Sequence, residues 1–144
     1  MNLIEKFPKM KKYEILEHKA DFKIRAFGRA KEELFLNMLL GMDAGLRPEL
    51  QNQKTKIRKI KIKSPDLAAL LVDFLSEALY LIQTNKEIYD NVKFIKFTDR
   101  EIEAELSGRE VERFGEDIKA VTYHGLDVHQ KEDNAWEATV LFDI

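Results

Sequence analysis

Two aspartates near opposite ends of the chain carry the clearest chemical suggestion in the sequence. Asp21 alternates with the apolar Phe22, so in a strand its side chain projects from the opposite, outer face. Asp143 stands in the same relation to Phe142. If the two strands are neighbours, both carboxylates and the terminal carboxylate of Ile144 crowd together, which raises a pKa or recruits a cation. Oxygen-only ligands favour Ca²⁺ or Mg²⁺. Taken alone, the pattern also fits two ordinary surface aspartates.

A run of positive charge offers a second chemistry. Six basic residues and no acidic one occur in a stretch of ten, which is a pattern that can contact phosphates: Lys54, Lys56, Arg58, Lys59, Lys61 and Lys63. Glutamates alternate in a later segment, at positions 101, 103 and 105, and opposite charges stabilise neighbouring strands. No aromatic residue interrupts the basic run, so it offers no platform for stacked bases. We therefore favour a solvated or cross-paired face over an RNA contact.

Most other site chemistries have no signature here. The sequence contains no cysteine, which excludes disulfide scaffolds, zinc ribbons and thiol nucleophiles. Its histidines, His18, His124 and His129, do not occur at a zinc-binding spacing, and no glycine-rich phosphate loop or GxSxG motif is present. With 24 basic and 26 acidic residues the net charge is −2, so no global field draws the chain to nucleic acid.

The elements that position these residues are predicted from periodicity. We expect helices over 31–43 and 65–83, the second capped by Ser64 with Pro65 in its first position. Alternation predicts strands over 13–16, 22–27, 54–63, 92–97, 101–106, 120–128 and 136–144. A change of apolar parity near Arg58 and Lys59 predicts a bulge. Short links between the later strands predict an α+β fold, a two-layer arrangement of a mainly antiparallel sheet with two helices on one face.

The length of 144 residues predicts one domain, which we place at residues 13–144. Residues 1–12 contain Pro8 and no sustained period, and we expect them to form a flexible N-terminal extension. No apolar run reaches the length of a membrane span, and residues 1–12 lack the apolar segment of a signal peptide. A soluble, cytoplasmic protein with no membrane contact is expected.

Four blocks of the sequence resemble the archease family. The segment YEILEHKADFKIRAFG, from Tyr13, resembles the family's opening signature, YE.LEHTAD.G..A.G. LLVDFLSEALYLI resembles its second helix, DIKAVTYHGLDV its VKAVTYH segment, and W.A.V.FDI its ending. The blocks occur in the right order over most of the chain after residue 12. Lys19 and Lys23 depart from the family's Thr and Gly, and each adds a positive charge beside Asp21.

The resemblance implies function by partnership. Archeases are accessory proteins of the tRNA-splicing RNA ligase, which joins a 3′-phosphate or cyclic-phosphate end to a 5′-hydroxyl through a guanylylated histidine. The family is thought to promote that guanylylation and repeated turnover in tRNA splicing, with no catalytic activity of its own and only indirect or transient RNA contact. A role as chaperone or specificity modulator of a tRNA methyltransferase is the alternative.

The resemblance also implies site residues. It assigns a divalent cation, Ca²⁺ first and Mg²⁺ or Mn²⁺ as alternatives, to Asp21, Asp143 and the terminal Ile144. Lys119, in the KAVTYH segment, is implied as a phosphate or partner contact, against the alternative of a solvated strand lysine. His18 and His124 are expected to orient or pack.

Overall fold

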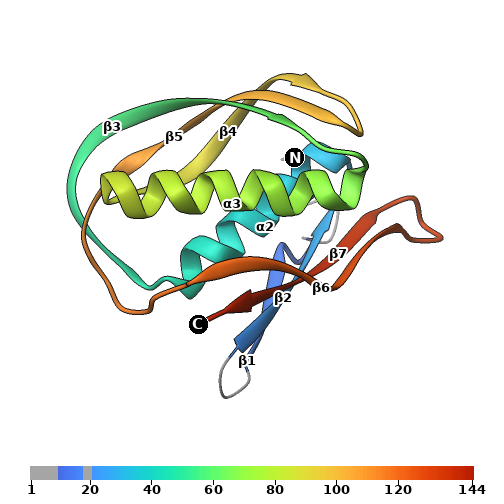
Figure 1. Ribbon diagram of the computed structural model, residues 1–144, viewed down its shortest axis with the longest axis horizontal. Helices are drawn as coiled ribbons and strands as arrows, with labels where there is room; N and C mark the ends of the chain where they lie inside the picture. Colours follow the sequence, from blue (N-terminus) through green and yellow to red (C-terminus); the bar gives the residue numbers. More distant parts are fainter. Residues whose placement is uncertain (1–9, 18–20) are drawn as a thin grey trace, which may run out of the picture.

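The computed structural model describes residues 10–17 and 21–144, and Figure 1 shows their arrangement. Most of the predicted extension over residues 1–12, together with His18 and Lys19, lies outside the described residues.

Within residues 10–17 and 21–144, seven antiparallel strands form two sheets. The first sheet has the order β1-β2-β7-β6, and its members are β1 (Tyr13–Glu17), β2 (Asp21–Gly28), β7 (Trp136–Asp143) and β6 (Ala120–Gln130). The second has the order β3-β5-β4, and its members are β3 (Pro48–Lys63), β5 (Glu101–Phe114) and β4 (Glu87–Phe97). The helices of the described residues, α2 (Lys31–Gly45) and α3 (Leu67–Asn85), lie between the sheets (Figure 1).

The α+β class, with two helices and antiparallel strands, is confirmed, but the strands divide into two sheets where the sequence predicted one. Both helices contact strands of both sheets. On α2 the buried positions extend around most of the helix, including Phe35, Asn37, Leu39 and Gly41. A helix with such wide burial needs cover on two sides, and a single sheet provides only one.

The start of α3 differs from the prediction. Its N-cap is Asp66, whose carboxylate accepts a hydrogen bond from the backbone N–H of Ala69 at 2.8 Å. Ser64 does not cap the helix; its hydroxyl donates to Asp73 at 2.5 Å. By length and composition α3 is long and apolar enough to cross a membrane, which the search for apolar runs in the sequence did not predict, and 44% of that span is buried inside the fold.

The bulge predicted near Arg58 and Lys59 is wrong. Residues Thr55–Lys63 pair with β5 in an unbroken register, and the register shifts lie earlier, between Glu49 and Thr55. The apolar alternation is interrupted because Arg58, a charged residue, lies on the inner face of the strand, where an apolar residue was expected. Its guanidinium donates to both carboxylate oxygens of Glu87, at 2.9 and 2.8 Å.

Glu87 is therefore a buried charge with partners. Its side chain is 3% exposed, and the hydroxyl of Tyr89 donates to it at 2.7 Å. The hydrogen bonds from Arg58 hold the pKa of Glu87 below its usual range, against the opposing effect of burial.

A second buried carboxyl group has no such partners. Asp43, on α2, is buried, and neither of its oxygens has a hydrogen-bond partner among the described residues. Burial raises the pKa of Asp43 well above its ordinary value, and the nearby charge of Asp90 raises it further. The fold therefore favours the neutral form of Asp43.

Candidate functional site

Asp21 and Asp143 lie directly opposite each other in the β2–β7 pair. Directly opposite residues of an antiparallel pair lie on the same face, with Cβ atoms about 4.5–5.5 Å apart. The next residues, Phe22 and Phe142, face the core, where their rings stack with centroids 5.4 Å apart. The two aspartates therefore share the outer face at one end of the sheet.

The remaining predicted residues, Lys119 and Ile144, lie near the same end of the sheet, just before β6 and just after β7. Ala120 is the register partner of Asp143 on its other side, and the backbone N–H of Lys119 donates to the Asp143 carbonyl at 2.8 Å. The Lys119 side chain is exposed. Ile144 follows Asp143 directly. The fold thus brings Asp21, Asp143, Ile144 and Lys119 together at one sheet end.

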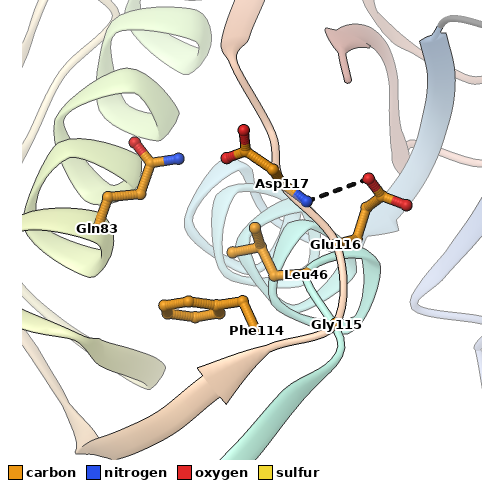
Figure 2. A pocket seen from close by; sticks show the side chains of 6 residues that line it. All are labelled: Leu46, Gln83, Phe114, Gly115, Glu116 and Asp117. Atoms are coloured by element: carbon orange, nitrogen blue, oxygen red, sulfur yellow. Dashed lines mark hydrogen bonds between the residues drawn. The ribbon is translucent and has the colours of Figure 1, made fainter.

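The segment that carries Lys119 into this position is tied to both helices. The backbone N–H of Gly115 donates to the Arg47 carbonyl at 2.9 Å, just beyond the end of α2. On α3, the Gln83 amide donates to the carbonyl of Ile118 at 2.7 Å, and Ile118 is fully buried. Gln83 and residues of this segment line a cavity of about 340 Å³, and Figure 2 shows the Gln83 side chain facing the segment.

A second cavity, of about 320 Å³, lies beside Ile144. Three charged residues line it together with apolar ones: Glu17, Arg47, Glu116, Ile15, Phe22 and Ile144 are among its lining residues. Arg47 lies 3.7 Å from the Glu17 carboxylate. Glu116 lines both cavities, so both border the segment that carries Lys119.

The charges of Asp21 and Asp143 are not neutralised within the described chain. Over residues 10–17 and 21–144, neither carboxylate has an ion-pair or side-chain hydrogen-bond partner. In the same residues, no three His, Asp or Glu side chains are placed to hold a metal ion. The available donors are the two aspartate carboxylates, oxygen ligands of the kind that a hard cation takes, with water completing its coordination.

Lys23 lies on the same face of the sheet as the two aspartates. It is exposed, pairs with Leu141 in the register, and lies two residues from Asp21 on the same side of β2. Its ammonium adds a positive charge near the carboxylates, which lowers the electrostatic attraction of the site for a cation.

The histidines are placed differently from one another. His124 is exposed in the irregular stretch of β6 between Thr122 and Asp127, where its backbone N–H donates to the Thr122 hydroxyl at 3.3 Å. His129 lies between two carboxylates, with Nδ1 2.7 Å from Asp127 and Nε2 3.2 Å from Glu137. The sequence reasoning missed this group, although strand parity and the β6–β7 turn could have found it.

The basic run of β3 forms part of a cross-paired face. Lys59, Lys61 and Lys63 stand opposite Glu105, Glu103 and Glu101 of β5, and Lys61 lies 3.4 Å from Glu103. On the other side of β5, the ammonium of Lys96 lies 2.9 Å from Glu101. The cross-paired interpretation of these charges is confirmed.

Comparison with known proteins identifies the family. A model of the Archease protein family (MTH1598/TM1083) matches residues 13–144, which include every strand and helix described above. The chain belongs to the archease family. The protein archease of Methanosarcina barkeri is 36% identical over 143 residues, which cover 93% of this chain and 97% of that relative.

Solved structures of archease-like proteins share the fold. The solution structure of Methanobacterium thermoautotrophicum protein 1598 superposes with a TM-score of 0.70 at 24% identity, covering 94% of this chain and all of that one. The crystal structure of a Thermotoga maritima archease, described as a possible chaperone, gives a TM-score of 0.66 at 20% identity and covers 96% of this chain and all of that one.

Proposed function

We propose that this chain is an accessory protein of the tRNA-splicing RNA ligase, which promotes guanylylation of the ligase histidine and so allows repeated turnover. Family membership supports a role in partnership with another protein. The observation that carries the proposal is the in-register pair Asp21 and Asp143, with Lys119 bonded to the main chain of Asp143. These groups are exposed or half-buried, so a partner can reach them.

In this proposal Asp21, Asp143 and Ile144 hold a divalent cation through their oxygen atoms, Ca²⁺ first among the candidates. A cation so held supplies positive charge that stabilises phosphate oxygens. The chain's own contribution is to keep the carboxylates on adjacent strands of a rigid sheet, where little ordering is needed on binding. Lys119 presents a second positive charge beside them, suited to a phosphate or an acidic group of the partner.

The proposal assigns no catalytic activity to the chain itself. The sequence has no nucleotide-binding loop and no cysteine, which leaves guanylylation and strand joining to the ligase. Contact with RNA is then indirect or transient, through the ligase. A cytoplasmic location accords with this role.

The deciding experiment measures ligated RNA per ligase molecule at saturating GTP, with the accessory protein in catalytic amounts. Wild type is expected to convert a stalled reaction into many turnovers. Asp21→Asn and Asp143→Asn each remove one carboxylate charge without a large change in shape, and both are expected to abolish the stimulation. Lys119→Ala is expected to weaken it through a lost phosphate or partner contact.

Asp127→Asn is the matched control, because Asp127 lies on β6 of the same sheet, away from the Asp21–Asp143 pair in the register. It should stimulate as wild type does. Undiminished stimulation by the Asp21→Asn/Asp143→Asn double variant would contradict the cation-presenting mechanism.

A second candidate is a chaperone or specificity modulator of a tRNA methyltransferase. The description of the Thermotoga maritima protein as a possible chaperone supports this second candidate function. This function requires action in stoichiometric amounts on a methyltransferase, measured as suppressed aggregation or altered site choice. Such an effect, together with no stimulation of the ligase, would replace the first proposal.

A further inference from the structure

The second sheet has one long regular edge. β3 is its first strand, and among the described residues only β5 pairs with Thr55–Lys63, in an unbroken register. A strand with one unpaired side presents a row of N–H and C=O groups that can pair with another extended chain.

The other edges of the two sheets are poorer templates. β1 is only five residues long. β4 has register shifts at two places, and β6 has one between Thr122 and Asp127. Bulges and short strands are devices that prevent strand addition. By this comparison, Thr55–Lys63 is the open edge.

The charges along this edge define what it can accept. The outer face of β3 carries Lys59, Lys61 and Lys63, all exposed, with Ile57 next in line and 59% exposed. Each lysine has a single acidic neighbour in the register, on β5, and the edge side of each is open among the described residues. An arriving strand would therefore meet a row of positive charges.

β5 shows the kind of strand that fits. It places Glu101, Glu103 and Glu105 between the lysines of β3 on one side and Lys93 and Lys96 of β4 on the other. Opposite charges facing each other across strands are stabilising. We infer that the Thr55–Lys63 edge of β3 binds an extended, acidic segment of a partner protein by strand addition, with acidic residues at alternate positions.

Two other occupants fit less well. A second copy of this chain, pairing β3 with β3, would bring lysines opposite lysines, which is destabilising. A nucleic acid lying across the sheet face would meet the central row of glutamates, and no aromatic side chain occurs in Thr55–Lys63 for its bases to stack on. An acidic strand bound at the edge of β3 has only lysines as its charged neighbours on the outer face, and no glutamates.

The probe is a capped peptide of alternating Glu and Val, equal in length to Thr55–Lys63, added to the full chain. Backbone amide exchange should slow within Thr55–Lys63, and fluorescence anisotropy should give a dissociation constant. The same peptide carrying N-methyl groups along one edge keeps its charge but cannot form the ladder, and it is expected to bind at least about tenfold more weakly.

A pair of double variants separates the β3 edge from general attraction of charge. K59E/K61E reverses two lysines on the open edge, and K93E/K96E reverses the two that flank the same glutamates from β4. The first is expected to weaken peptide binding by at least about tenfold, and the second to change it little.

Several results would overturn the inference. These are equal binding of the N-methylated peptide, equal loss in both double variants, absence of amide protection in Thr55–Lys63, or stronger binding of a single-stranded RNA oligomer to this edge. The amide-exchange measurement needs only the unmodified chain, so it decides the matter even if a variant fails to fold. None of these readouts involves the ligase, so the proposed function can fail or hold independently.

Discussion

The two sheets treat charge on their outer faces in opposite ways. On the β3-β5-β4 sheet, lysines and glutamates stand opposite each other, and each row places a carboxylate beside an ammonium. At the end of the β1-β2-β7-β6 sheet, Asp21 and Asp143 stand opposite each other, with no ion-pair partner in the described chain. A like-charge pair in register destabilises a sheet, while opposite charges stabilise it.

The difference separates carboxylates that are already paired from carboxylates that are available for binding. The glutamates of β5 need no further partner, because each already has a cationic neighbour. The aspartate pair, by contrast, becomes more favourable only when a cation or a basic partner arrives. Four predictions test this distinction, in order of decreasing effect.

The most buried paired charge should be the most costly to remove. Glu87→Ala takes away the acceptor for both Arg58 and Tyr89, whose polar groups are then left without their partner. Loss of these buried hydrogen bonds and of the ion pair is expected to lower the free energy of unfolding by about 3 kcal/mol. Urea denaturation measures it, with Glu101→Ala on the exposed face as the control. If the two variants lose equal stability, burial is not what distinguishes Glu87.

The aspartate pair should respond to a cation. Ca²⁺ at a hundredfold its dissociation constant is expected to raise the free energy of unfolding of the wild type by about 2.7 kcal/mol. Asp21→Asn and Asp143→Asn should largely lose this response, and each should be slightly more stable than wild type in the presence of a chelator, since like-charge repulsion is relieved.

Thermal melting with and without Ca²⁺ provides the measurement, and Asp127→Asn should retain the full response. An identical Ca²⁺ response in wild type and Asp21→Asn would contradict the assignment of the site.

Asp43 provides a third case, a carboxyl group that is buried without a partner. The unfolded chain releases the Asp43 proton near its ordinary pKa, whereas the folded chain retains it to higher pH. The wild type therefore loses stability as pH rises from the ordinary pKa toward the raised one. Asp43→Asn should remove this loss and stabilise the fold by upwards of about 1 kcal/mol at neutral pH, with little gain near pH 4.

Denaturation at several pH values checks the effect of Asp43→Asn, and Asp117→Asn, in the exposed segment before β6, is the control. A gain that did not vary with pH would mean that the carboxyl group is not the cause.

The smallest effect is expected on the exposed paired face. Lys61→Glu places a glutamate opposite Glu103 and should cost about 0.5 kcal/mol at low salt. The loss should shrink at high salt, because screening weakens interactions between exposed charges. An effect of the size expected for Glu87→Ala, or one insensitive to salt, would contradict the view that this face is held by solvated pairs.

Local patterns predicted the elements well and their assembly less well. The alternation of Phe22 and Ile24 located β2, and the apolar spacing of α3 located that helix, because both signals are periodic and local. The division into two sheets depends on how far burial extends around α2, which periodicity does not reveal. The wrongly predicted bulge had a similar cause. Arg58 lies on the inner face because Glu87, distant in the sequence, accepts its hydrogen bonds there.

The candidate site could be predicted only in part. Parity correctly placed Asp21 and Asp143 on an outer face, and the family resemblance selected them from among many aspartates. Their pairing in register depends on the strand order, which composition and spacing do not contain. Asp43 was not singled out, because an isolated aspartate at the end of a helical pattern looks like any surface residue until the packing around it is known.

The strand order of the first sheet also bears on how the chain folds. β4 and β5 are joined by a short turn and can pair early, whereas β2 and β7 meet from positions about 120 residues apart in sequence, a closure that is entropically slow. Since β7 lies between β2 and β6, neither inner pairing of that sheet can form before β7 is in place. The two aspartates are thus brought together only by a pairing between distant parts of the chain, so a chain in which that pairing has not formed has no assembled site to offer a partner.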